Sequence, residues 1–136
     1  MGTNYYAVLE DDVCEHCGRG EAKEIHIGKS SSGWCFSLHV ASPSEPNIPF
    51  DLNSWRELWK NCVYIRDEYG NKISISLMER TILERYRKLE DKDAYTEFLI
   101  KNHAVAGPNG LARHPIGEYC VGHGDGTYDL IIGEFS

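Results

Sequence analysis

The sequence has no apolar run approaching the roughly 20 residues that a membrane-spanning helix needs. Its first residues do not combine a basic segment with an apolar one, so we expect no secretory signal. Internal repeats and low-complexity tracts are also missing from the 136 residues. Together, these absences predict a protein of the cytoplasm that does not associate with a membrane.

Cysteine is scarce and odd in number, with five residues in the chain. An odd count without an export signal argues against a framework of disulfides. Cys14 and Cys17 are separated by only two residues. In a reducing compartment, such a pair indicates metal binding or redox chemistry.

An excess of positive charge is missing as well. The 21 acidic residues outnumber the 14 basic ones and leave a net charge of −7. An acidic chain repels phosphate backbones, so the composition disfavours non-specific nucleic-acid binding. The segment 104–136 is especially acidic, since Arg113 is its one basic residue. Acidic faces of this kind suit basic patches on a protein partner.

With 41% hydrophobic residues, the chain can form one buried core. We expect a single domain over residues 1–136. Within it, residues 1–40 form a zinc-binding β subregion and residues 41–136 an α+β remainder. The predicted fold class is α+β, with a zinc-stapled N-terminal β-hairpin, a small antiparallel sheet and two or three helices.

Alternating side chains predict strands at 4–9, 24–27 and 34–40, with the GKSSSG segment as the turn between the last two. The apolar face of the third strand carries Trp34, Phe36, Leu38 and Val40. Its opposite face carries Cys35, Ser37 and His39. This hairpin therefore separates core residues from candidate ligands.

Capping patterns predict three helices after the proline-rich segment 41–50. The first begins at Ser54 and carries Trp55 and Trp59 on an apolar stripe, which we interpret as core. The second spans about 77–90 after Ser76, and the third runs from Asp93 to about His103. A hairpin with Tyr69-Gly70-Asn71 at its turn lies between the first two helices, and a strand follows the GHGDG turn near the C-terminus.

The segment from Cys14 to His39 has the ligand pattern of a zinc site. Zinc takes about four thiolate or imidazole ligands in a tetrahedron. Cys14, Cys17 and His26 supply three of them, and the fourth is His39 or, alternatively, Cys35. The last two are four residues apart, roughly 13 Å along a strand, so they do not easily bind one ion together. Four protein ligands leave no open position, which predicts structural Zn²⁺ that contributes folding energy.

Two other interpretations of these features remain. A redox function for the CxxC pair would require a helix beginning directly after it, whereas glycines and a hairpin surround this pair. Near the C-terminus, GHGDGTYD carries His123, Asp125 and Asp129. Together with His114, this segment has residue types used in general acid–base catalysis or in binding a second metal. A plain turn also explains its glycines.

Several stretches resemble a group of small bacteriophage-encoded proteins described only as uncharacterised zinc-binding proteins. They are the opening MGTNYY, the CxxCGR turn from Cys14 to Arg19, HIGKSS with GWCFSLH, and the tail GHGDGTYDLIIGEFS. The resemblance implies expression in the cytoplasm of a bacterial host. It also implies a metal site at Cys14, Cys17, His26 and His39, and no established activity.

These features lead to one main function hypothesis and two alternatives. The first is a phage accessory protein that binds and modulates a host protein, in host takeover or counter-defence. The second is a nucleic-acid or nucleotide-processing enzyme that uses His114, His123 and Asp125. The third is a protein that sequesters a signalling nucleotide through Lys29, Arg113 and the glycine-rich turns.

Overall fold

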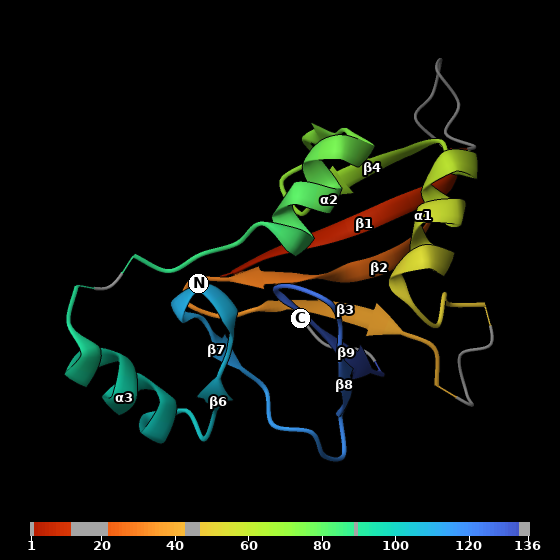
Figure 1. Ribbon diagram of the computed structural model, residues 1–136. Helices are drawn as coiled ribbons and strands as arrows, with labels where there is room; N and C mark the ends of the chain where they lie inside the picture. The colour runs from red at the N-terminus through yellow and green to blue at the C-terminus, as the bar shows by residue number, and fades with distance from the viewer. Residues whose placement is uncertain (1, 12–21, 43–46, 89, 134–136) are drawn as a thin grey trace.

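The computed structural model describes residues 2–11, 22–42, 47–88 and 90–133 (Figure 1). The strands are β1 (Gly2–Asp11), β2 (Ala22–Ser31), β3 (Phe36–Val40), β4 (Tyr64–Asp67), β5 (Lys72–Ile73), β6 (Val105–Ala106), β7 (Ala112–Arg113), β8 (Cys120–His123) and β9 (Tyr128–Ile132). The helices are α1 (Leu52–Asn61), α2 (Ile75–Leu83) and α3 (Lys92–Lys101), with a short 3-10 turn, η1, at Pro108–Gly110. Across these described ranges, no helix is long and apolar enough to cross a membrane.

Seven strands form one sheet in the order β5-β4-β1-β2-β3-β9-β8. Neighbouring strands are antiparallel except β3 and β9, which run parallel. A parallel pair needs a long connection, and all three helices lie in the chain between these two strands. The α+β class is confirmed. The sheet is larger than the predicted one because β9 inserts beside β3 and brings β8 with it.

The β2–β3 pair is antiparallel, as predicted, but Gly28, Lys29 and Ser30 belong to the strand and not to the turn. Gly28 faces Leu38 across the pair. A Cβ atom at Gly28 would lie 2.1 Å from the carbonyl oxygen of Ser37. Only glycine therefore lets β2 approach β3 this closely, and β2 continues through it to Ser31.

The helices begin at capping residues other than those predicted. Asp51 caps α1 by accepting from the backbone N–H of Ser54 (2.7 Å), and Ser74 caps α2 by accepting from Leu77 N–H (3.1 Å). Asp91 caps α3 in the same manner. Each predicted cap lies two or three residues inside its helix. A cap needs extended backbone, and several serines and aspartates compete for that position in each segment.

The core lies between the sheet and the two helices on one of its faces, α1 and α2 (Figure 1). Trp55 and Trp59 of α1 are fully buried, which confirms their predicted place in the core. Met78 and Ile82 of α2 join them. The sheet contributes Ile27, Phe36, Leu38 and Val40. Fully burying one such aliphatic or aromatic side chain stabilises the fold by about 1.5–3 kcal/mol.

Helix α3 lies apart from this core and has no buried residue (Figure 1). Phe98 anchors it, because its ring packs edge-on against Trp34 (centroids 5.7 Å apart) and lies under the guanidinium of Arg87 (4.0 Å). The hydroxyl of Tyr95 donates to the carbonyl of Leu111 (2.9 Å). These few contacts connect α3 to the segments that precede β3 and β7 and to the segment that follows α2.

Candidate functional site

The first candidate site is the histidine pair formed by His26 on β2 and His39 on β3. Both side chains lie on the face of the sheet opposite α1 and α2, as the alternation predicts. Their ring centroids are 5.8 Å apart. Two imidazoles that bind one ion through bonds of about 2.1 Å have centroids roughly 5–6 Å apart. The observed spacing therefore suits a shared metal ion.

Hydrogen bonds orient both rings. Nδ1 of His39 donates to the carbonyl of His26 (2.8 Å), and Nε2 of His26 lies 2.8 Å from Oδ1 of Asn4. A carbonyl only accepts, so the neutral His39 ring has its proton on Nδ1 and its lone pair on Nε2. Metal-binding histidines are commonly oriented by a backbone carbonyl in this way.

Burial lowers the pKa of His26 to about 4, and the positive charge that His39 carries when protonated is the second-largest cause. The ring of His26 is therefore neutral at pH 7. A metal binds only the neutral form of imidazole. His39 is 2% exposed and His26 is partly buried, so the surrounding protein shields His39 more fully than His26.

The other predicted zinc ligands are not assembled around this pair in the described part of the chain. Cys14 and Cys17 lie outside the described residues. Within the described ranges, no group of three or more His, Cys, Asp or Glu side chains could hold a metal ion. The last pair of residues in the β1–β2 ladder is Asp11 with Ala22, and His26 lies four residues further along β2, about 13 Å.

Cys35, the alternative fourth ligand, belongs to a different cluster. Its backbone N–H donates to the carbonyl of Ala112 (2.9 Å), which ties it to β7. Burial raises the pKa of its thiol to about 11, and the negative charge of Asp129 is the second-largest cause. Cys35 therefore lies near Asp129 and Arg113, and among the residues that the structure describes it does not form a group of three metal ligands with His26 and His39.

The second candidate site surrounds the fully buried carboxylate of Asp129 on β9. Its Oδ1 accepts from Nδ1 of His123 (2.8 Å), and its Oδ2 accepts from the backbone N–H of His114 (3.1 Å). Nε of Arg113 lies 2.7 Å from Oδ1. The cluster thus contains a buried negative charge with a cationic partner and two hydrogen-bond donors. We call these four residues the Asp129 cluster.

The guanidinium of Arg113 bonds to this cluster and to the neighbouring backbone. Besides the ion pair with Asp129, its Nη2 donates to the carbonyls of Gly126 (2.8 Å) and Tyr128 (3.1 Å). Its guanidinium therefore fixes the β8–β9 turn to β7. This arrangement leaves Arg113 poorly placed for the predicted nucleotide contact, while Lys29 lies two strands away from β9, on β2.

A mostly apolar cavity of about 430 Å³ opens next to the Asp129 cluster. Its lining includes Ser37, His114, Ile116, Tyr119, Cys120 and Ile131. The ring of His114 stacks on Trp34 (centroids 4.7 Å apart, planes at 23°), and its Nε2 lies 3.3 Å from Oγ of Ser37. A hydroxyl and an imidazole thus meet at the wall of this cavity.

The chemistry of this pair is incomplete for nucleophilic catalysis. Burial lowers the pKa of His114, so its ring is neutral and can accept a proton. In a serine triad, however, a carboxylate orients the imidazole ring, whereas Asp129 bonds the backbone of His114. Burial also raises the pKa of the Cys120 thiol, which makes Cys120 a weak nucleophile.

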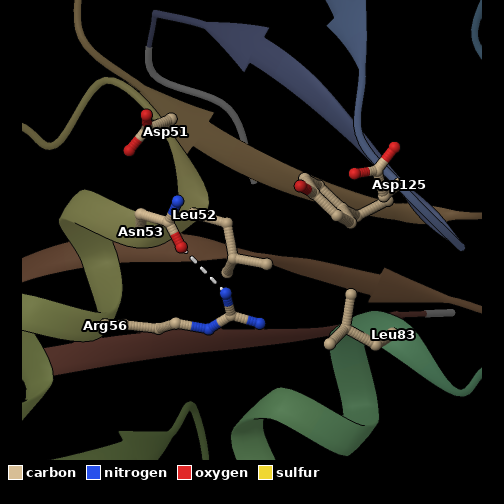
Figure 2. A pocket seen from close by; sticks show the side chains of 7 residues that line it. Asp51, Leu52, Asn53, Arg56, Leu83 and Asp125 are labelled. Atoms are coloured by element: carbon tan, nitrogen blue, oxygen red, sulfur yellow. Dashed lines mark hydrogen bonds between the residues drawn. The ribbon is translucent and has the colours of Figure 1, made fainter.

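The structure separates the three predicted catalytic residues. His114 and His123 both contact Asp129, whereas Asp125 lines another cavity, of about 360 Å³, together with Asp51 and Arg56 (Figure 2). Ser37 was not among the predicted site residues. The sequence contains one clue to Asp129, because it is a charged residue within the otherwise apolar run YDLII. No comparable clue distinguishes Ser37 from other strand residues.

Comparison with known proteins gives no match, since no protein family, curated protein or solved structure is similar to this chain.

Proposed function

We propose that this chain is a zinc-stapled binding protein that engages and modulates a protein of a bacterial host. The binding surface is the exposed apolar patch formed by Ile116 and Tyr119 just before β8, which we call the β8 patch. Its partner is a protein segment that combines an apolar side chain with basic residues.

The observation that carries this proposal is the clustering of large apolar side chains around one cavity. Ile116 is 68% exposed and Tyr119 66%, and both line the cavity. Single exposed apolar residues are ordinary, but a group beside an apolar cavity is typical of an interaction site. An aromatic residue at the rim and a pocket that can receive a side chain are the usual parts of a binding hot spot.

The backbone next to the patch can also pair with a partner. β8 is the last strand in the sheet order, and within the described residues it pairs only with β9. An edge strand presents N–H and C=O groups to which an extended segment can add. Backbone pairing along β8 and insertion of one side chain into the cavity would act together.

Charge favours a basic partner. Glu118 lies between two patch residues and lines the cavity. The whole segment 104–136 is acidic, and the one basic residue in it, Arg113, is directed at Asp129. Complementary charge around an apolar contact increases the association rate and selects the partner.

The zinc site is part of the same proposal. His26 and His39 are close enough to share an ion, neutral at His26, and oriented by hydrogen bonds, while Cys14 and Cys17 supply two thiolates. For the sulfurs to reach the pair, the segment between β1 and β2 must span about 13 Å back along the sheet. A closed site of this kind stabilises the sheet, and the binding function then belongs to the surface.

The bacterial partner is inferred from the resemblance to small phage-encoded proteins. Such a protein would act in the cytoplasm of the host. An acidic protein with an apolar patch suits interference with a host factor by occupying its basic surface.

Site-specific crosslinking tests this proposal. A photoreactive residue replaces Tyr119 in one protein and Tyr69 in a control, because Tyr69 is 72% exposed and lies in the β4–β5 turn. We expect one bacterial protein to crosslink through position 119 and not through position 69. The identified partner is then purified, and its affinity for the unmodified chain and for Ile116→Asp is measured by calorimetry.

We expect Ile116→Asp to weaken the affinity by about tenfold or more, because a carboxylate would replace an apolar contact at the cavity. Tyr69→Ala is the control and should bind like the unmodified chain. Equal affinity of Ile116→Asp and the unmodified chain would eliminate the β8 patch as the binding surface.

A second candidate function is the hydrolysis of a nucleotide or nucleic acid, in which the neutral ring of His114 acts as a general base on water and Ser37 contacts that ring. This alternative retains His114 from the predicted catalytic group of His114, His123 and Asp125, leaves out the other two, and adds Ser37. A panel of nucleotides and short oligonucleotides tests it, with Ser37→Ala and His114→Gln as variants. Turnover that persists in both variants, or no turnover in the unmodified chain, excludes it.

A further inference from the structure

A second cavity, of about 360 Å³, lies between the start of α1, the end of α2 and the turn that joins β8 to β9. It shares no lining residue with the cavity of the β8 patch. Figure 2 shows Asp51 and Asp125 on opposite sides of it, with the side chain of Arg56 reaching toward the space below them. Leu52 and Leu83 provide apolar walls.

Some of the polar groups that line the cavity already form hydrogen bonds or ion pairs within the chain. Oδ1 of Asp51 caps α1 through the N–H of Ser54. Nε of Arg56 pairs with Glu79 (2.5 Å), and its Nη1 donates to Asn53 (2.9 Å). These contacts hold the guanidinium in place at the edge of the cavity.

The remaining polar groups are available to a ligand. Among the described residues, Nη2 of Arg56 makes no hydrogen bond, and the carboxylate of Asp125 has no ion pair or hydrogen bond. One cationic donor and one anionic acceptor thus border the same small space, with Asp51 as a second carboxylate. A ligand that carries both charges can satisfy the two together.

We propose that this cavity binds a small zwitterion that carries an ammonium and a carboxylate group, the chemistry of a free α-amino acid. The ammonium lies between Asp125 and Asp51, and the carboxylate lies at Nη2 of Arg56. The side chain of the ligand packs between Leu52 and Leu83. The site is separate from the β8 patch and does not depend on its function.

Other ligand classes fit the same charges less well. A simple anion would face two carboxylates, and the N-terminus of α1 already has Asp51 as its anionic partner. A divalent cation would lie against the guanidinium of Arg56. A plain amine would leave Nη2 of Arg56 without a charged acceptor.

Gly124 supports the geometry of the cavity. Tyr128, another lining residue, is 9% exposed, and its ring packs directly over the backbone of Gly124. A Cβ atom at position 124 would lie 1.8 Å from the Tyr128 ring, so glycine is required there. The GHGDG turn thus supplies Gly124, against which the Tyr128 ring of the cavity wall packs, and Asp125 at the cavity edge.

Titration calorimetry tests the inference on the complete chain. Free L-amino acids are added one at a time up to about 10 mM, the range of weak small-ligand binding, with L-leucine first because of its apolar side chain. The best ligand is then compared with the amine that lacks its carboxylate and the acid that lacks its ammonium. For leucine, these are 3-methylbutylamine and 4-methylpentanoate.

We expect one or more amino acids to bind, and both analogues to bind at least about tenfold more weakly, because each loses a charge-assisted hydrogen bond. Asp125→Asn should weaken the amino acid by a similar factor. Glu97→Gln, an equal change of charge on exposed α3, should leave the affinity unchanged. Amide NMR spectra of both variants verify that they remain folded.

Three results would overturn the inference. The first is that no amino acid binds at this concentration. The second is that the amine binds as tightly as the amino acid, which would remove the carboxylate subsite at Arg56. The third is an equal loss of affinity in Asp125→Asn and Glu97→Gln, since a general effect of net charge would then explain the binding.

Discussion

Two pairs of histidines lie on the same face of the sheet and differ in the charges around them. His39 and Ser37 point to the face opposite the helices, and Asp129 lies beside Ser37 in the parallel β3–β9 register. His26 and His39 therefore share this face with the Asp129 cluster. The first pair, His26 and His39, contacts a carbonyl and an amide. In the second pair, His114 and His123, His123 contacts the carboxylate of Asp129, which also pairs with Arg113.

This difference indicates separate roles. Asp129 and Arg113 balance each other within the chain, so an added cation would be repelled by the guanidinium. The rings of the His26–His39 pair contact a backbone carbonyl and a side-chain amide, and two thiolates from Cys14 and Cys17 would match the charge of a zinc ion. The Asp129 cluster is complete as it stands, while the His26–His39 pair is suited to receive a metal.

The largest expected effect concerns the Asp129 cluster. Asp129→Asn keeps the shape of the side chain but leaves Arg113 without a charged partner in a buried position. We expect the free energy of unfolding to fall by about 3–5 kcal/mol, measured by urea denaturation. Asp125→Asn is the matched control on the exposed turn and should change stability by less than about 0.5 kcal/mol. Similar losses in both variants would refute a structural role for the cluster.

Metal analysis separates the two histidine pairs directly. We expect close to one zinc ion per chain, lost in His39→Ala and Cys17→Ser but retained in His123→Ala. Removing zinc with a chelator should lower the free energy of unfolding by about 2.7 kcal/mol if the free metal had stood at a hundred times its dissociation constant. Metal retained in His39→Ala, or lost equally in His123→Ala, would contradict the proposed ligands.

A smaller effect is expected from the residues that orient the rings. Asn4→Ala removes the partner of His26 Nε2 and should weaken zinc affinity by about 10–100-fold, because partners of this type fix the ligand ring. Ser37→Ala removes the hydroxyl beside His114 and should leave zinc affinity unchanged. Competition with a chromophoric chelator measures both. Equal affinities in the two variants would show that Asn4 has no such role.

The smallest expected effect is a dependence of the free energy of unfolding on pH, which arises from His114 of the His114–His123 pair. Burial lowers the pKa of His114 from its ordinary value near 6.5, with Asp129 opposing this shift and His123 adding to it. The unfolded chain therefore takes up a proton before the folded one does. The stability contributed by neutral His114 is complete above about pH 6.5 and declines as the pH falls toward the folded pKa, by at most about 1.4 kcal/mol per pH unit.

Urea denaturation at about pH 7.5 and pH 5.5 measures this dependence. In His114→Asn, the loss of stability between the two pH values should be smaller than in the unmodified chain. An equal loss in both proteins would assign the pH dependence to other groups.

Much of the fold followed from local patterns. Alternation identified β1, β2 and β3, and it placed Phe36, Leu38 and Val40 on the core face and His39 on the other. The tryptophan stripe of α1 and the turn at Gly70 were also predicted correctly. These features depend on residues close in the chain, so their periodicity is visible without tertiary contacts.

Other features depended on contacts between distant segments. Nothing near β9 indicates that it pairs with β3 across residues 41–127. The grouping of His114 and His123 around Asp129, and the separation of Asp125 from them, follow from that pairing. The exact capping residues also differ, because several polar side chains in each segment can cap and packing decides among them.

By itself, the sequence determined the α+β class and the two faces of the first strands, while it left His39 and Cys35 as alternative neighbours of His26. Those properties arise from side-chain periodicity and short hairpin connections. Only the tertiary structure decided that β9 enters the sheet beside β3, that Asp129 becomes a buried charge with Arg113, and that Asp125 faces Asp51 and Arg56. The reason is physical, because each of these contacts joins residues from distant segments, and the burial that stabilises them exists only once the sheet has assembled.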